Sequence, residues 1–265
     1  MKDLRFGLFL APSLRGVYEA VAYAIGRRVG LSTEVVPEPS YENFGLDRYD
    51  VCFVCSLAYV SHEQVDGSPH VPIAAPIPAG SRYGRRPVYF SDVIVHRDSQ
   101  FRSLLDLRGR SWAFNEPLSH SGYGVMRHHL VRIGEIDGFF DRVVESGAHE
   151  ESIRMIRRGE VDGSAIDSHL LGVEMRNDPP LRDELRVIDV LGPSTIQPVT
   201  ASRRLSRELL DEIRKALIEI HLDLRVRREL ERGMIDRFVP VDAGSYDDIR
   251  LMTAACEQAE FMTLR

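Results

Sequence analysis

The sequence predicts an α/β fold in which parallel strands alternate with helices that cover the sheet. Short apolar runs, typical of buried strands, alternate with longer segments whose apolar residues recur at helical spacing. Turn residues, above all Gly and Pro, separate many of these segments. The alternation occurs early in the chain and again after residue 103, which predicts two α/β units.

The first unit opens with a buried strand and an amphipathic helix. Pro12 ends the strand, and Gly30 follows the helix at a position where glycine commonly closes helices. Two further strands follow, and a short helix begins directly after the second. The expected elements are a strand over 4–11, a helix over 14–29, strands over 31–36 and 50–55, and a helix from Ser56.

The rest of the chain continues with similar elements. Residues 70–84 are rich in Pro and Gly, and neither strand nor helix is predicted there. A second set of apolar patterns begins after them. The expected elements are a strand over 87–95, a strand from Ser111 that feeds a helix reaching Leu130, a helix over 150–158, strands over 161–167, 185–191 and 196–200, and helices over 205–232 and 245–262.

Two long connections, around residues 84–91 and 192–200, divide the chain into lobes. A chain that leaves one lobe once and returns once forms a discontinuous lobe around a continuous one. We therefore expect a first lobe of residues 1–88 and 198–265 and a second lobe of residues 89–197. Ligand is expected in a cleft between the lobes, and closure of that cleft would bend the two connections.

The composition excludes several classes of partner. A chain of 265 residues with 43% apolar content can bury a sizeable core. Its net charge of -6 argues against nucleic acid or an anionic membrane as the main partner, because both require a concentrated positive field. Lys2 and Lys215 are its lysines, and neither follows a Gly-rich turn, so the phosphate loop of nucleotide hydrolases is absent.

The N-terminal residues bear on the compartment. The apolar run 6–11 is too short for the hydrophobic region of a secretory leader, and no transmembrane segment is visible. We expect a cytoplasmic monomer without membrane insertion, or an extracytoplasmic protein whose leader was replaced by Met. Cys52 and Cys55 point to opposite faces of a predicted strand, so these thiols, and Cys256 on a helix, are expected to be buried and inert.

The stretch 111–130 is the centre of the predicted site. It begins as a strand, breaks at Pro117, and offers the hydroxyls of Ser119 and Ser121 just before a helix. A helix N-terminus leaves backbone N–H groups unpaired and carries partial positive charge, so it can receive an anion without Lys or Arg. The sequence therefore predicts an oxyanion pocket here. The alternative is that Ser119 is only a helix cap and Ser121 only a first-turn residue.

Five short motifs occur in a characteristic order. They are Tyr-Phe-Ser at 89–91, Ser-Leu-Leu-Asp-Leu-Arg-Gly at 103–109, Ser-His-Ser-Gly-Tyr at 119–123, Ser-Gly-Ala-His at 146–149, and Gly-Glu-Val-Asp at 159–162. In this order they resemble the phosphate/phosphite/phosphonate-binding proteins of ABC transporters, over about residues 4–220. The resemblance implies a type 2 periplasmic-binding-protein (Venus flytrap) fold with two lobes joined by two hinge strands. It also implies a substrate-binding protein that closes on a small tetrahedral oxyanion and has an ABC permease as its partner.

The resemblance also suggests which residues bind the ligand. Ser119, Ser121 and the N–H groups near Gly122 and Tyr123 match the phosphoryl cradle, and His149 would donate to a ligand oxygen. His120 departs from the family, in which a small residue is more common, and places a bulkier group near the pocket. The other candidates are Tyr89 on the crossover strand, Asp167 as a ligand contact or a helix N-cap, and Ser13, Ser56 and Tyr59 in the first lobe.

Two other functions remain open. An enzyme of menaquinone- or thiamine-pathway type can share this fold, and so can a ligand-sensing domain. Catalysis would require a nucleophile or an acid/base pair, and the pair His149 and Asp167 is the candidate. The sequence contains no Gly-x-Ser-x-Gly motif and no Cys/His metal spacing, so we expect a binding protein without cofactor or metal.

Overall fold

The computed structural model describes residues 3–46, 48–63 and 69–264. They form two compact units, one of Met1–Val88 with Thr195–Asp247 and one of Tyr89–Ser194 with Asp248–Arg265. The chain therefore passes between units at three points, whereas the sequence predicted two. The third point separates residues 248–265 from the first lobe, to which they were assigned.

The first unit contains a six-stranded sheet of order β11-β4-β10-β3-β1-β2. Strand β1 pairs in parallel with β2 and β3, whereas β10 runs antiparallel to β3 and β4, and β11 antiparallel to β4. The sheet is thus mixed rather than parallel. Its strands are β1 (Leu4–Leu8), β2 (Thr33–Pro37), β3 (Val51–Phe53), β4 (His70–Pro78), β10 (Val199–Ser202) and β11 (Ile235–Val239).

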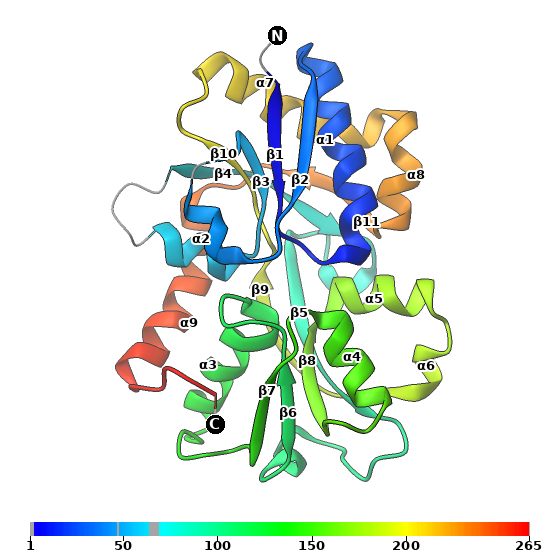
Figure 1. Cartoon of the computed structure of the whole chain (residues 1–265), viewed down its shortest axis with the longest axis vertical. Helices are drawn as coiled ribbons and strands as arrows, with labels where there is room; N and C mark the ends of the chain where they lie inside the picture. The colour runs from blue at the N-terminus through cyan, green and yellow to red at the C-terminus, as the bar shows by residue number, and fades with distance from the viewer. Residues whose placement is uncertain (1–2, 47, 64–68, 265) are drawn as a thin grey trace. The chain divides into compact units, whose positions relative to one another are not determined.

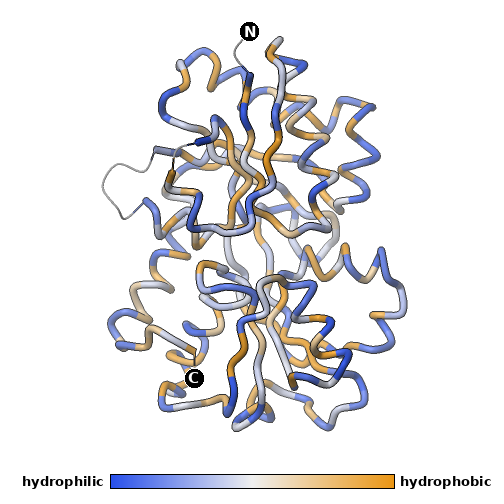
Figure 2. Tube along the Cα trace, in the orientation of Figure 1, coloured by the Kyte–Doolittle hydropathy of each residue, from blue (hydrophilic) through white to orange (hydrophobic). Residues whose placement is uncertain are grey.

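Helices of the first unit follow the strands and pack on the sheet (Figure 1). Helix α1 ends at Gly30, whose φ of 71° is left-handed, as the sequence predicts for a C-terminal glycine. In Figure 2 this helix alternates between apolar and polar residues, as expected for one with a buried face. The helices are α1 (Arg15–Val29), α2 (Ser56–Glu63), α7 (Arg207–Glu219) and α8 (Leu224–Arg232), with 3-10 turns at Pro12–Leu14, Tyr41–Leu46, Ser81–Tyr83, Ile220–Leu222 and Ala243–Tyr246.

The second unit contains a five-stranded sheet of order β7-β6-β8-β5-β9. Strand β6 pairs in parallel with β7 and β8, and β5 runs antiparallel to β8. The strands are β5 (Val88–His96), β6 (Ser111–Phe114), β7 (Arg142–Glu145), β8 (Gly163–Asp167) and β9 (Leu185–Thr195). The helical segments are η4 (Leu104–Leu107), the π-helical turn η5 (His120–Gly124), α3 (Val125–Arg132), α4 (His149–Arg157), α5 (Ser168–Asn177), α6 (Leu181–Glu184) and α9 (Asp247–Gln258).

The core of the second unit includes the end of the chain. Trp112 is fully buried and stacks on Phe140 with ring centroids 4.7 Å apart. Phe261 and Leu264 belong to the same cluster of buried side chains. The buried Arg127 donates two hydrogen bonds to the Phe261 carbonyl, of 3.0 Å from Nε and 2.8 Å from Nη2. These contacts explain why the last residues pack with the second unit.

Three strands, β4, β7 and β11, and one helix break differ from the sequence-based expectations. Strand β4 contains three prolines and was not predicted because proline cannot donate to a sheet ladder. Strands β7 and β11 were also not predicted. The helix expected over 205–232 is interrupted by the turn Ile220–Leu222, after which the Asp223 carboxylate accepts a 3.0 Å hydrogen bond from the Arg225 N–H and starts α8. No helix among the described residues has the length and apolarity needed to cross a bilayer.

We predict that Arg127→Met lowers the free energy of unfolding by about 2 to 4 kcal/mol, because two charge-assisted hydrogen bonds to Phe261 are lost. Urea denaturation measures the change. The matched control is Arg154→Met, which removes an exposed ion pair to Glu151 and is expected to cost at most about 1 kcal/mol. Equal costs for the two variants would contradict the anchoring role of Arg127.

Candidate functional site

The candidate site lies at one edge of the second sheet. Strands β7, β6 and β8 run parallel, so their carboxyl ends meet at the same edge. Each strand is followed there by a helical segment: η5 and α3 after β6, α4 after β7, and α5 after β8. This edge gathers helix N-termini, which is the usual location of ligand sites in α/β sheets.

A chain of hydrogen bonds links three of the predicted ligand residues. Ser119 Oγ accepts from the Gly122 N–H at 3.3 Å and lies 3.5 Å from Ser121 Oγ. Ser121 Oγ is 2.8 Å from His149 Nε2. All of these residues are buried. Ser119 is thus the N-cap of η5, as the alternative interpretation held, and is also in contact with the other candidates.

His149 is held at the start of α4 by the end of strand β6. The Ser146 N–H donates to the Phe114 carbonyl and the Gly147 N–H to the Asn115 carbonyl, both at 2.8 Å. The N-cap of α4, Ala148, provides no side-chain hydrogen bond to the helix. Burial lowers the pKa of His149 from 6.5 to about 4, so its imidazole is neutral at pH 7. Its Nδ1 is buried and has no hydrogen-bond partner among the described residues.

Asn115 belongs to this cluster, although sequence reasoning did not identify it. A Cβ added to Gly122 would lie 2.1 Å from Asn115 Oδ1 and 3.2 Å from His149 Cε1. Position 122 therefore requires glycine because the backbone of η5 closely approaches both side chains. Asn115 Oδ1 is buried without a partner among the residues described. The available signal was its position directly after β6, at the carboxyl end of a predicted strand.

Two predicted residues of the turn face other parts of the unit. The Tyr123 ring packs on Phe114 with centroids 4.7 Å apart, and its hydroxyl donates to the Met262 carbonyl at 3.3 Å. His120 Nε2 lies 3.0 Å from Ser194 Oγ, and its ring meets that of Tyr89 edge-on at 6.4 Å. Ser194 was missed by the sequence analysis. Burial, reinforced by the nearby His128, lowers the pKa of His120 to about 3.

Asp167 is the N-cap of α5. Its carboxylate accepts hydrogen bonds from the N–H groups of His169 at 2.8 Å and Leu170 at 3.3 Å. The alternative interpretation of Asp167 as a helix N-cap is therefore confirmed. The Phe90 N–H donates to Ser168 Oγ at 3.1 Å, which ties the start of α5 to strand β5.

The candidates of the first unit lie at the corresponding edge of their own sheet. Ser13 follows β1 and Ser56 follows β3, and these strands are parallel neighbours. Ser56 Oγ is buried without a hydrogen-bond partner in the described part of the chain. Tyr59 is engaged within its unit, because its hydroxyl donates to Glu63 Oε1 at 2.7 Å and its ring meets Tyr246 at 5.2 Å. The expected cleft between the two units stays a prediction.

Neither metal chemistry nor a redox pair is evident in the described residues. They contain no group of His, Cys, Asp or Glu that could hold a metal ion. Cys52, Cys55 and Cys256 are buried and form no disulfide, as the sequence predicted.

The family of the chain follows from a comparison with family models. Residues 11–246 match the model of the phosphonate-type periplasmic substrate-binding protein of ABC transporters. The chain belongs to this family. Its members are substrate-binding components of transporters, so the family recognised from the sequence motifs and the expected absence of catalysis are both confirmed. No curated protein sequence gives a significant match.

Solved structures show the same fold at low sequence identity. A binding-protein component of an ABC phosphonate transporter from Pseudomonas aeruginosa is 18% identical, with a TM-score of 0.84 over 97% of this chain and 87% of that one. PhnD1 of Prochlorococcus marinus, solved with methylphosphonate, is 15% identical, with a TM-score of 0.84 over 98% of both chains. An ancestral arginine-binding protein gives 18% and 0.60 over 88% of this chain and 98% of that one. The predicted type 2 periplasmic-binding-protein fold is confirmed.

We predict that this family member loses stability as the pH falls from 7 to 5. The unfolded chain protonates His149 near pH 6.5, whereas the folded chain does so near pH 4, so acid favours unfolding across that interval. His149→Gln should reduce the loss between pH 7 and 5 by about 2 kcal/mol in urea denaturation. His96→Gln, at a more exposed position, is the control. An undiminished loss in His149→Gln would contradict the buried, neutral imidazole.

A second prediction concerns the close approach at Gly122. Gly122→Ala should cost about 1 to 3 kcal/mol of stability, because the new methyl group overlaps Asn115 Oδ1. The matched control is Gly16→Ala in α1, where the added Cβ would meet no neighbouring atom within 4 Å. This variant is expected to gain a little stability from the higher helix propensity of alanine. Thermal unfolding monitored by circular dichroism compares the two. A neutral Gly122→Ala would show that Asn115 can move away without cost.

Proposed function

We propose that this chain binds a small phosphorus oxyanion, a phosphonate, phosphate or phosphite, at the carboxyl edge of the second sheet. The observation that carries the proposal is the buried chain of Ser119, Ser121 and His149 at the start of two helical segments. Further support comes from PhnD1, which was solved in complex with methylphosphonate and shares the fold. The chain would deliver its ligand to an ABC permease from a periplasmic location, in keeping with the family.

The hydrogen-bonding capacity of these residues fits an anion. Neutral His149 carries one N–H and Ser121 one O–H, and the 2.8 Å contact between them uses one of these two protons. The other proton is left to donate, from Nδ1 or from Oγ according to the tautomer. Ser119 Oγ accepts a hydrogen bond from the Gly122 N–H, which fixes the position of the oxygen in the turn and leaves its own O–H able to donate. The cluster therefore offers the Ser119 hydroxyl and one further donor, the Ser121 hydroxyl or the His149 imidazole, to the oxygens of the ligand.

Helix α4 is better suited to the ligand than α5. The first N–H groups of α5 at His169 and Leu170 already donate to Asp167, whereas the N-cap of α4 provides no such bond. The N-terminus of α4 would then add its partial positive charge at this edge. The anion is compensated by oriented neutral donors, so a strongly basic surface is not needed, and the net charge of -6 presents no conflict.

We predict that methylphosphonate, phosphate or phosphite binds with a measurable affinity in isothermal titration calorimetry. Ser119→Ala and Ser121→Ala should each weaken that ligand by about 1 to 3 kcal/mol, the contribution of a charge-assisted hydrogen bond. Ser111→Ala is the matched control, because Ser111 lies at the opposite end of the same strand and bonds Asp162 at 2.6 Å. Failure of all three ligands to bind at millimolar concentration would refute the proposal. Unchanged affinity in both site variants would remove the serines from the cradle.

A further inference from the structure

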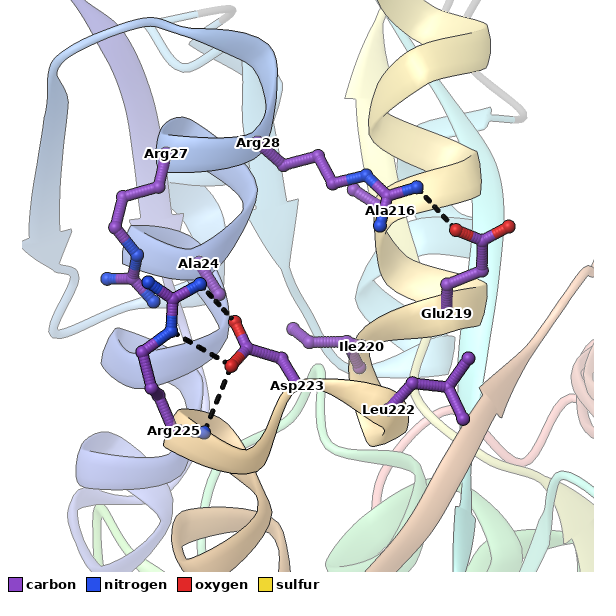
Figure 3. Close-up of a pocket in the computed structure, with 9 residues that line it drawn as sticks. All are labelled: Ala24, Arg27, Arg28, Ala216, Glu219, Ile220, Leu222, Asp223 and Arg225. Atoms are coloured by element: carbon purple, nitrogen blue, oxygen red, sulfur yellow. Dashed lines mark hydrogen bonds and ion pairs between the residues drawn. The ribbon is translucent and has the colours of Figure 1, made fainter.

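A second concave site lies in the first unit, among three helical segments. A pocket of about 620 Å³ opens between the last turns of α1, the end of α7 with the turn that follows it, and the start of α8 (Figure 3). This volume is within the range of small-molecule sites. Nine residues line the pocket: Ala24, Arg27, Arg28, Ala216, Glu219, Ile220, Leu222, Asp223 and Arg225.

This pocket is separate from the predicted ligand residues of its own unit. Helix α1 has 15 residues and therefore spans about 22 Å. It begins shortly after Ser13, at the carboxyl edge of the sheet, and Arg27 and Arg28 lie in its last turn. The pocket is thus at the far end of α1 from Ser13. Function at the oxyanion site does not account for it.

The floor of the pocket is apolar and its rim is cationic. Ala24, Ala216 and Ile220 are buried, and the two alanines are too small to fill the space between the helices. Three arginines and two acids line the pocket, so its lining residues carry a net charge of +1. A hollow of this kind fits a ligand that has both an apolar body and a negative group.

The arginines differ in their partners. Arg28 forms an ion pair with Glu219, and Arg225 donates to both carboxylate oxygens of Asp223, at 3.0 Å from Nε and 2.9 Å from Nη2. Arg27 has no hydrogen bond or ion pair with any described residue. Arg27 and Arg225 both line the pocket, and Figure 3 shows their side chains extending from α1 and α8. An anion bound in the pocket would be attracted by both guanidinium charges.

A neighbouring depression extends the site. It has a volume of about 420 Å³ and is lined by Ala20, Tyr23 and Val226 together with the same Arg27 and Arg225. The arginine pair therefore borders both hollows. Tyr23 is 45% exposed, so its ring is available to an apolar or aromatic group.

From these observations we propose that the α1–α7–α8 pocket binds an organic anion, with a phosphate or carboxylate head on Arg27 and Arg225 and an apolar body on the alanine floor or beside Tyr23. The Arg27 guanidinium matches such head groups through paired hydrogen bonds, and Arg225, whose Nε and Nη2 already donate to Asp223, adds positive charge at the same pocket. The apolar body distinguishes this ligand from the small oxyanion of the other site.

Phenyl phosphate is the probe for this site, titrated calorimetrically into the full chain with methylphosphonate present in excess. We expect one further equivalent to bind, and inorganic phosphate to bind at least about fivefold more weakly because it lacks the apolar body. Arg27→Gln and Arg225→Gln should each reduce the affinity at least about tenfold. Arg15→Gln is the matched control at the other end of α1, where Arg15 pairs with Glu19, and should leave it unchanged.

The outcome separates this proposal from the function of the oxyanion site. Ser121→Ala should leave the phenyl phosphate equivalent intact, and the titration can be run in that variant even if methylphosphonate does not bind. Absence of saturable binding up to about 10 mM phenyl phosphate would overturn the proposal. The proposal would also be overturned if Arg27→Gln and Arg15→Gln lost the same affinity for phenyl phosphate, or if phenyl phosphate and inorganic phosphate bound with equal affinity. Circular dichroism of each variant checks that the fold is kept.

Discussion

The parallel pairing of β6 with both β7 and β8 is the constraint on which the candidate site depends. Because the three strands end at one edge, residues distant in sequence, such as Ser121 and His149, meet there. The pairing itself requires a glycine. A Cβ at Gly163 would lie 2.8 Å from Leu107 and 3.3 Å from Trp112, so only glycine lets β8 approach the buried indole. The core of the second unit thus sets the positions of the polar residues above it.

Burial gives the polar cluster its chemical character. Removing His149 and His120 from water disfavours their charged forms, so each ring is neutral where an exposed histidine would begin to titrate. The two rings nevertheless face different partners. His149 joins the serines of the turn, whereas His120 contacts Tyr89 and Ser194, which lie where the chain enters and leaves the second unit. His120 therefore connects the predicted cradle to both of those strands.

The sequence revealed most of the elements and much of the candidate cluster, for identifiable reasons. Strong apolar periodicity located α1, and the order of the five motifs identified the family. Strand β4 was not predicted because Pro72, Pro76 and Pro78 are unfavourable in a strand. It forms because it pairs with β10 and β11, which are distant in sequence. Ser194 was not identified because its contact with His120 spans 74 positions of sequence, whereas Asn115, at the end of a predicted strand, was overlooked. Local patterns carry no record of such contacts.

The placement of the last residues determines the order in which the chain can complete its two cores during synthesis. The first unit has all its strands and its main helices once residue 247 has been made, although it is assembled from two separate stretches. The second unit, whose strands are all made earlier, still lacks Phe261 and Leu264, which belong to its buried cluster. Since domains fold as units while the chain emerges from its N-terminus, the unit that carries the candidate oxyanion site is the last to close its core. Its Trp112 cluster stays incomplete until residue 264 has left the ribosome.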